Sequence, residues 1–184
     1  MGVDREVSRR AVFLDRDGVL NASIVRDGRP YPPARVEDLE ILPGVRDALD
    51  QLKRAGFVLL VVTNQPDVAR GTQTREAIEA IHDRIRAELP VDAIYGCYHD
   101  DAEACACRKP APGMLLDGAR DWDVALPDSF MVGDRWRDIE AGVAAGCRTI
   151  FIDYEYRERQ PRAFDAKVTS LAEAAAWILG EITT

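Results

Sequence analysis

Acidic side chains follow two short runs of the sequence, at places where they could share a cation. Asp15 and Asp17 come directly after the apolar residues 11–14, and Asp134 comes shortly after residues 129–132. If both runs are strands of one parallel sheet, their carboxyl ends lie at the edge where α/β proteins bind ligands. A single acid at a strand end is usually a turn former or a helix cap, but several at one edge favour a catalytic site.

This arrangement is suited to phosphoryl transfer. Asp15 and Asp134 could converge on one Mg²⁺, a hard cation that takes oxygen ligands. The metal would relieve the repulsion between these carboxylates and an anionic substrate. Asp15 could attack phosphorus and form a covalent aspartyl-phosphate, while Asp17 could protonate the leaving oxygen and later deprotonate water. The pattern therefore predicts Mg²⁺-dependent phosphoryl transfer to water through a covalent intermediate.

A second set of metal-ligand side chains lies in an eleven-residue segment. Cys97, His99, Cys105 and Cys107 follow the pattern C-x-H-x5-C-x-C. Three cysteines and one histidine fit tetrahedral Zn²⁺. Because four protein ligands leave no open position, we expect this zinc to be structural rather than catalytic.

Basic side chains stand next to both candidate metal sites. Arg108 and Lys109 directly follow the last cysteine of the zinc-binding loop, and Arg135 follows Asp134. A phosphate dianion needs such local cations as well as Mg²⁺ at an edge so rich in carboxylates. A zinc ion in the loop would also restrict where Arg108 and Lys109 point, because groups behind a site fix the groups that bind.

Strands and helices alternate along the chain. Apolar runs predict strands at 11–14, 57–62, 93–98, 129–132 and 149–152, and helical periodicity predicts helices at 45–52, 74–89, 112–122, 138–145 and 170–179. Strands separated by helices indicate βαβ units, and therefore an α/β fold with a doubly wound parallel sheet of the Rossmann-like type. Residues 21–39 and 154–169 lack periodicity and exceed the usual loop length, so we expect function or disorder there.

Composition limits the class of protein. The 184 residues are 47% apolar and 30% charged, with a formal net charge of −8, which fits a single domain over residues 1–184. The acidity argues against a nucleic-acid-binding surface, but not against a small anionic ligand held by local cations. No segment approaches the ~18 apolar residues of a membrane span, and residues 1–10 do not resemble a secretory signal. We therefore expect a cytoplasmic monomer with reduced cysteines and no membrane partner.

Four short motifs are together similar to those of the haloacid dehalogenase-like phosphatases. They are DRDGVLN at 15–21, TNQ at 63–65, RKP at 108–110 and VGD at 132–134, in the family's order and spacing over nearly the whole chain. The resemblance implies that Asp15 is the nucleophile, Asp17 the acid and base, and Thr63 and Lys109 the groups that stabilise the phosphoryl group. It also implies Mg²⁺ bound by Asp15, the backbone carbonyl of Asp17, and Asp134.

Two further expectations come from the same resemblance. The intervals after the first two motifs are too short for a large inserted cap domain, so we expect an open site. Asp138 lies one helical turn beyond Asp134, and in the family this position more often starts a helix or acts indirectly. We therefore do not expect Asp138 among the direct metal ligands.

The cysteine-rich loop narrows the resemblance to two subfamilies, the D-glycero-D-manno-heptose 1,7-bisphosphate 7-phosphatases and the histidinol-phosphate phosphatases. The five-residue gap before Cys105 resembles the histidinol enzymes, whereas FLDRDGVLN at 13–21, VARG at 68–71 and CRKPAPGMLL at 107–116 resemble the heptose enzymes. The leading hypothesis is removal of the 7-phosphate of a heptose 1,7-bisphosphate, a small phosphorylated sugar, with Asn64, Arg108 and Arg135 binding substrate. Histidinol-phosphate hydrolysis and a non-catalytic zinc-stabilised binding domain are the alternatives.

Departures from the heptose pattern concern the sugar rather than the reaction. Pro66 follows TNQ and removes a backbone donor next to the site. Arg135 stands where the heptose enzymes usually have Lys, and it binds as a planar fork rather than a point charge. The loop after Asn21 carries Arg26 and Arg29, which are candidates for binding the second phosphate.

Overall fold

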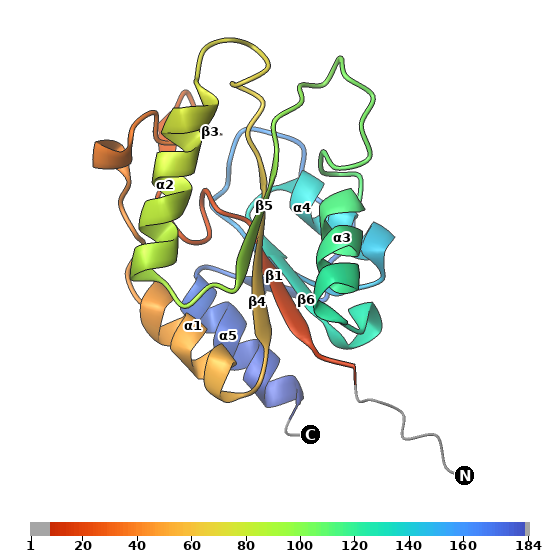
Figure 1. Ribbon diagram of the computed structural model, residues 1–184. Helices are drawn as coiled ribbons and strands as arrows, with labels where there is room; N and C mark the ends of the chain where they lie inside the picture. Colours follow the sequence, from red (N-terminus) through yellow and green to blue (C-terminus); the bar gives the residue numbers. More distant parts are fainter. Residues whose placement is uncertain (1–7, 183–184) are drawn as a thin grey trace.

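The computed structural model describes residues 8–182, and its centre is a six-stranded parallel sheet with helices on both faces (Figure 1). The strand order is β5-β4-β1-β6-β7-β8. The strands of this sheet are β1 (Ala11–Leu14), β4 (Val58–Asn64), β5 (Ala93–Cys97), β6 (Phe130–Gly133), β7 (Arg148–Ile152) and β8 (Ala166–Val168). The helices are α1 (Val45–Arg54), α2 (Arg75–Glu88), α3 (Gly113–Trp122), α4 (Trp136–Ala145) and α5 (Leu171–Glu181), with 3₁₀ turns η1 (Val36–Asp38) and η2 (Leu126–Asp128). The predicted doubly wound α/β fold is confirmed.

The central strands are apolar on both faces because a helical layer covers each face. Along β1, Val12 and Leu14 pack into the core beneath α1, α2 and α5, whereas Ala11 and Phe13 pack into the core beneath α3 and α4. All four side chains are fully buried. The alternation of side chains along a strand thus assigns each residue of β1 to one of two cores.

The helix ends follow from local side-chain chemistry. The hydroxyl of Thr74 accepts a hydrogen bond from the backbone N–H of Ala77 at 3.2 Å, and Ser170 caps α5 in the same way. Helix α4 begins at Trp136, two residues earlier than predicted. The cause is Asp138, the third residue of the helix. Its carboxylate accepts a hydrogen bond from the backbone N–H of Arg135 at 3.0 Å and thereby caps the helix start.

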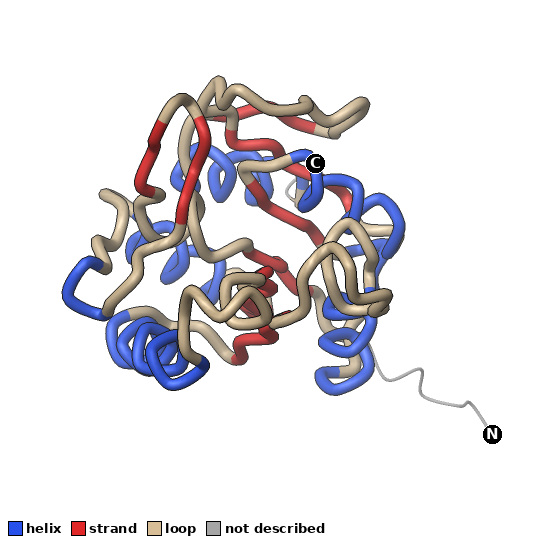
Figure 2. Tube along the Cα trace, turned by 90° about the horizontal axis from the view of Figure 1, so that it is seen from above, coloured by secondary structure: helices blue, strands red, loops and turns tan. Residues whose placement is uncertain are grey.

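Three strands and the 3₁₀ turn η1 lie in the two segments for which the sequence predicts no element. Within residues 21–39, β2 (Ile24–Arg26) and β3 (Arg29–Tyr31) form an antiparallel hairpin. Within residues 154–169, β8 adds a sixth strand beside β7. Figure 2 views the molecule from the end where the loops gather, and the hairpin stands there as a separate pair of strands beside the sheet. Each of these strands has only three residues, too few for a periodic pattern.

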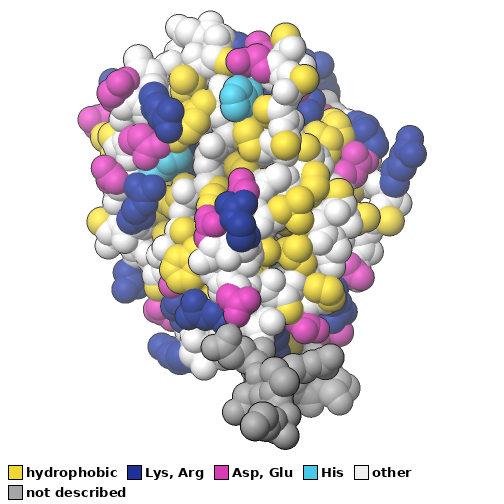
Figure 3. Space-filling view, turned by 45° about the vertical axis from the view of Figure 1, so that its right-hand side comes forward, with side chains coloured by type: hydrophobic (Ala, Val, Ile, Leu, Met, Phe, Trp, Pro, Cys, Tyr) yellow, Lys and Arg dark blue, Asp and Glu magenta, His cyan; other side chains and the backbone are white. Residues whose placement is uncertain are grey.

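The surface carries charges of both signs. On the face drawn in Figure 3, basic and acidic side chains are interspersed, with apolar side chains between them. Among the described residues, none of the helices is long and apolar enough to cross a membrane. Residues 1–7, which belong to the segment that we do not expect to be a secretory signal, lie outside the described part of the chain.

Candidate active site

The parallel register brings three strand ends together. Leu14, the last residue of β1, pairs with Val61 of β4 on one side and with Val132 of β6 on the other. The backbone N–H of Asp15 then donates to the carbonyl of Val132 at 3.0 Å. The strand pairing therefore places Asp15 between the ends of β4 and β6. The sequence predicts that these strand ends share one edge of the sheet, but not their order.

Two glycines allow the polypeptide to close around the carboxylates. Gly18 has φ +85°, and a Cβ at this position would lie 2.0 Å from Oδ2 of Asp134. A Cβ at Gly133 would lie 2.1 Å from the Cβ of Asp138. Any larger residue would displace an aspartate, so both glycines are required by close approach.

Lys109 joins two buried aspartates. Its Nζ lies 2.8 Å from Oδ1 of Asp15, 2.7 Å from Oδ1 of Asp138 and 2.7 Å from the carbonyl oxygen of Val62. The lysine is 1% exposed, and although burial opposes its charge, the two aspartates raise its pKa above the usual value. Burial and the neighbouring Asp138 raise the pKa of Asp15 to about 7, against the lowering effect of Lys109. One ammonium is thus shared by two acids.

Asp134 has the surroundings of a metal ligand. Both of its carboxylate oxygens are buried, and neither makes a hydrogen bond of good geometry within residues 8–182, although the hydroxyl of Tyr156 lies near enough to influence its pKa. Burial, with Asp15 nearby, raises its pKa well above the usual value. Asp15, Asp134 and Asp138 each offer an oxygen within 4.8 Å of the others. An unpartnered buried carboxylate is costly, and this all-oxygen set fits Mg²⁺. The structure therefore brings Asp138 close to the other two carboxylates, although the family resemblance does not place it among the direct metal ligands.

Asp17 lies in a pocket of hydrogen-bond donors. Arg16 forms a forked ion pair with it at 3.0 Å, and Asn21 and Gln65 each donate to one of its oxygens at 2.9 Å. Burial opposes ionisation of Asp17. These donors nevertheless hold its pKa below the usual value, and Arg16 has the largest effect among them. Asp17 is therefore ionised at rest, which suits it to accept a proton from water, and it must take up a proton before it can act as an acid.

The two polar residues at the end of β4 face different partners. Thr63 is buried, and its hydroxyl accepts from Nε2 of Gln65 at 2.9 Å. Asn64 exchanges two hydrogen bonds with the backbone of Lys109, at 3.0 and 3.1 Å. Asn64 therefore holds the lysine segment in register with β4, in addition to lining the cleft above it.

A cleft of about 280 Å³ opens over these side chains. Six cations line it, namely Arg29, Arg70, Arg108, Lys109, Arg135 and Arg137. Arg135 is engaged by Glu158, with Nε 3.0 Å from one carboxylate oxygen. Arg29 lies in the cleft as proposed for a second-phosphate ligand, whereas Arg26 packs over the ring of Tyr31. Because six aspartates line the same cleft, an anionic ligand there needs a divalent cation as well as these basic groups.

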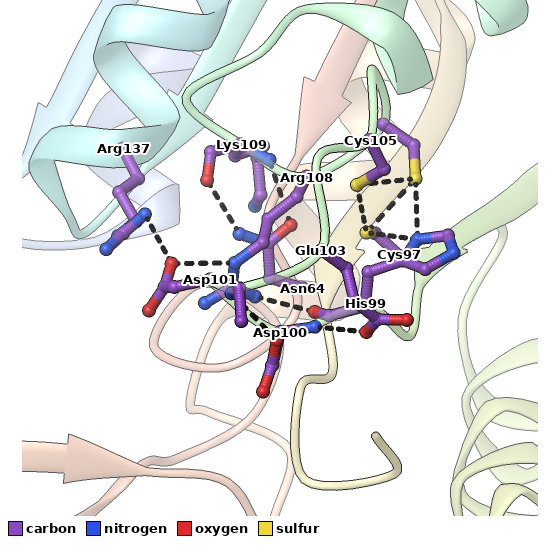
Figure 4. A network of polar contacts seen from close by, with 12 residues as sticks. Asn64, Cys97, His99, Asp100, Asp101, Glu103, Cys105, Arg108, Lys109 and Arg137 are labelled. Carbon is purple, nitrogen blue, oxygen red and sulfur yellow. Dashed lines mark hydrogen bonds and ion pairs between the residues drawn. The ribbon is translucent and has the colours of Figure 1, made fainter. Parts of the chain in front are cut away.

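The four predicted zinc ligands also converge. Their Sγ and Nδ1 atoms lie 3.1–3.7 Å apart in the five pairs Cys97–His99, Cys97–Cys105, Cys97–Cys107, Cys107–His99 and Cys107–Cys105. These separations are near the ~3.7 Å edge of a tetrahedron with Zn–S bonds of about 2.3 Å. The chemistry of the donors fits Zn²⁺, and Figure 4 shows the cluster beside the backbone of Arg108 and Lys109.

The loop that carries this cluster is seated tightly on α3. The backbone N–H of Gly113 donates to the carbonyl of Ala106 at 2.9 Å. A Cβ at Gly113 would lie 2.2 Å from the same oxygen. The first residue of α3 must therefore be glycine for the loop to approach, and the glycine after RKPAP has a packing role that the sequence pattern did not reveal.

Comparison with known proteins agrees with this geometry. The HAD-hydrolase-like family model matches residues 106–174. The D-glycero-β-D-manno-heptose-1,7-bisphosphate 7-phosphatase of Helicobacter pylori is 32% identical over 93% of this chain and 98% of its own length. The enzyme of the same name from Escherichia coli K12 is 37% identical over 94% of this chain and 89% of its own. The chain belongs to the haloacid dehalogenase-like phosphatases.

A solved structure supports the same assignment. The D,D-heptose 1,7-bisphosphate phosphatase of B. bronchiseptica, in complex with magnesium and phosphate, superimposes on this phosphatase with a TM-score of 0.80 and 34% sequence identity. The match covers 94% of this chain and 99% of that one. The expected family and fold are therefore confirmed, and magnesium as the cofactor is supported by that neighbour.

Sequence reasoning missed several residues of the phosphatase that the structure places at the site. Arg16 is fully buried and pairs with Asp17. It belongs to the first motif, but the motif gave no role for it. Arg70 and Arg137 also line the cleft. Arg70 lies in the VARG motif at 68–71, whereas Arg137 has no sequence signal beyond its charge. Asp138 contacts Lys109 across the site, and its spacing of four from Asp134 was the one available signal.

Proposed function

We propose that this phosphatase removes the 7-phosphate of D-glycero-D-manno-heptose 1,7-bisphosphate, with Mg²⁺ as cofactor. The observation that carries the proposal is the triad of Asp15, Lys109 and Asp134 at the floor of a cleft lined by cations. The names of the relatives that align over nearly the whole chain supply the substrate.

Each side chain at the cleft floor has a step that its position supports. Asp15, Asp134 and the backbone carbonyl of Asp17 would hold Mg²⁺, which screens the negative charge between carboxylates and phosphate. An oxygen of Asp15 attacks phosphorus, and the leaving sugar oxygen takes a proton from Asp17, which has first taken that proton up from solvent. Water, deprotonated by Asp17, then hydrolyses the aspartyl-phosphate. Lys109 neutralises charge on the transferring phosphoryl group, and Asp138 holds Lys109.

The remaining predicted residues have supporting roles in this proposal. Thr63 adds a hydroxyl near the phosphoryl group, Asn64 positions Lys109, and Arg108 and Arg135 bind the rest of the substrate. A structural Zn²⁺ on the cysteine and histidine cluster fixes the end of the loop that carries Arg108 and Lys109. A single domain over residues 1–184, a monomeric state and a cytoplasmic location remain predictions from the sequence.

A substrate panel tests the proposal. Phosphate release would be measured from the α- and β-anomers of heptose 1,7-bisphosphate, histidinol phosphate and simple hexose phosphates. We expect kcat/KM to be highest for one heptose anomer, because the outer cleft offers several guanidinium groups for a second phosphate. A wide preference for histidinol phosphate would contradict the assignment. The variant Asp15→Asn is the control for contaminating phosphatase.

A further inference from the structure

Three arginines from separate segments converge on one carboxylate at the outer end of the cleft. Nε of Arg108 lies 2.9 Å from Oδ1 of Asp101, and Nη1 of Arg137 lies 3.3 Å from the same oxygen. Nη2 of Arg70 lies 3.9 Å from Oδ2. Figure 4 shows the side chains of Arg108 and Arg137 directed at Asp101 from two sides. All four residues line the cleft that contains Asp15.

The arginines are held in place independently of Asp101. Arg108 also donates to the backbone carbonyl of His99 at 3.2 Å. Arg137 lies over the ring of Trp136, with its guanidinium carbon 4.7 Å from the ring centroid. Arg70 pairs with Asp67 at 3.3 Å. Removing the Asp101 carboxylate would therefore leave three guanidinium groups close together, which is the arrangement that recognises phosphate.

Asp101 itself is the easiest member of the group to move. Its side chain is 55% exposed, whereas that of Arg108 is 11% exposed. It lies in the short segment 100–104 between two proposed zinc ligands, so its side chain can turn into water while the ends of the loop stay fixed. An exposed ion pair contributes little net free energy, and its exchange for a phosphate dianion is favourable on charge.

We propose that Asp101 is an internal competitor for the phosphate group that the enzyme does not cleave. The carboxylate neutralises Arg70, Arg108 and Arg137 in the free enzyme, and the remote phosphate of a bisphosphate substrate displaces it. Arg70 and Arg137 are then specificity-determining residues beside Arg108. This inference rests on the proposed function, because it needs a substrate with two phosphates, and it adds a device that sets how strongly the second phosphate is bound.

The test compares two substrates that differ only in the remote phosphate, heptose 1,7-bisphosphate and heptose 7-phosphate. We expect Asp101→Asn to lower KM for the bisphosphate by about threefold to tenfold, with kcat within about twofold and the 7-phosphate constants unchanged. The matched control is Asp117→Asn, which makes the same change of charge on α3, outside the cleft and beside Arg120. An unchanged or higher KM in Asp101→Asn would overturn the proposal.

A second variant tests the other side of the pair. We expect Arg137→Ala to raise KM for the bisphosphate by about tenfold or more and to leave hydrolysis of the 7-phosphate unaffected, because hydrogen bonds between charged groups are the strong ones. Arg120→Ala, an exposed arginine on α3, is its control. If both substrates were affected equally, Arg137 would act on the fold or on the reaction rather than on the remote phosphate.

The two levels of the hypothesis fail differently. If the wild-type enzyme does not hydrolyse heptose 1,7-bisphosphate, the proposed function is wrong. The competitor role is then measured with fructose 1,6-bisphosphate and fructose 6-phosphate as inhibitors of p-nitrophenyl phosphate hydrolysis. Tighter inhibition of Asp101→Asn by the bisphosphate alone supports the competitor role, and equal inhibition constants in wild type and variant refute it.

Discussion

The two metal-ligand clusters of this phosphatase differ in how their donors are brought together. Cys97, His99, Cys105 and Cys107 come from eleven consecutive residues, and this cluster, called the rim cluster below, directly precedes the cleft residues Arg108 and Lys109 in the chain. Asp15 and Asp134 are separated by more than a hundred residues and meet only because β1 and β6 are neighbours in the sheet. A local cluster is a property of one loop, whereas the buried carboxylate cluster is a property of the whole fold.

The donors also differ in what they leave open. Four thiol and imidazole groups saturate a tetrahedral ion, so the rim cluster can hold a loop but not a substrate. The carboxylates at the floor are fewer and harder, and a metal there keeps positions for water and phosphate. Both clusters are connected to Lys109, since its Nζ donates to Asp15 at 2.8 Å and Cys107 stands two residues before it in the chain.

The largest expected effect on activity comes from the carboxylates at the floor of the cleft. Asp15→Asn removes the nucleophile without changing its size, and we expect phosphate release to fall by about 10⁴-fold. The enzyme should remain folded, because the substitution relieves repulsion among buried acids. Initial rates and circular dichroism, with Asp117→Asn alongside, measure both effects. Turnover above a tenth of wild type would exclude Asp15 as the nucleophile.

The next effect tests the residue that the two clusters share. Lys109→Met leaves Asp15 and Asp138 without their common cation. We expect activity to fall by about 10³-fold and the free energy of unfolding to fall by about 3 kcal/mol, because each buried carboxylate loses its partner. Urea unfolding monitored by tryptophan fluorescence gives the second value. A stable variant would show that the lysine is not the main counter-charge.

A smaller effect on turnover is expected from substitutions in the cysteine cluster. In Cys105→Ser combined with Cys107→Ser, zinc should be lost by metal analysis and kcat/KM should fall by about 10- to 100-fold, because Arg108 and Lys109 lose their fixed position. Added Mg²⁺ should not restore the activity. Cys147→Ser, at a free thiol outside the cluster, is the control. If the variant lost zinc but kept wild-type turnover, the cysteine cluster would have no influence on the catalytic carboxylates.

The smallest expected effect is a pH dependence of the stabilisation by Mg²⁺ at the carboxylates of the cleft floor. Burial raises the pKa of Asp15 from 3.8 to about 7, so the metal-free folded protein holds a proton more tightly than the unfolded chain does. The stability that this proton provides is present below about pH 4 and is lost as the pH rises through about 7. Mg²⁺ binds the ionised carboxylates, so it should raise Tm by about 5 °C more at about pH 8 than at about pH 5.5.

Differential scanning fluorimetry with and without Mg²⁺ at both pH values measures this difference. Asp134→Asn should abolish the Mg²⁺-dependent shift at either pH, since it removes a buried carboxylate of the proposed metal site. An equal rise of Tm at both pH values would mean that Mg²⁺ stabilises the protein at some other place.

The sequence was a good guide wherever the signal was local. Five strands of the sheet, the Thr74 and Ser170 caps and the spacing of the cysteine loop all depend on residues close together in the chain. Elements with three residues left no periodic pattern, so the hairpin and β8 could not be predicted. The start of α4 was wrong by two residues because a side-chain cap, rather than apolar periodicity, sets it.

The sequence by itself determined the α/β fold class and the motifs of the phosphatase, because periodicity and short spacings are written along the chain. Only the tertiary structure decided what those residues contact. It placed Asp138 on Lys109, buried Arg16 against Asp17, and drew Arg70, Arg108 and Arg137 to one carboxylate at Asp101. Such contacts join residues far apart in the chain, and they depend on strand order and loop path, which no local pattern specifies.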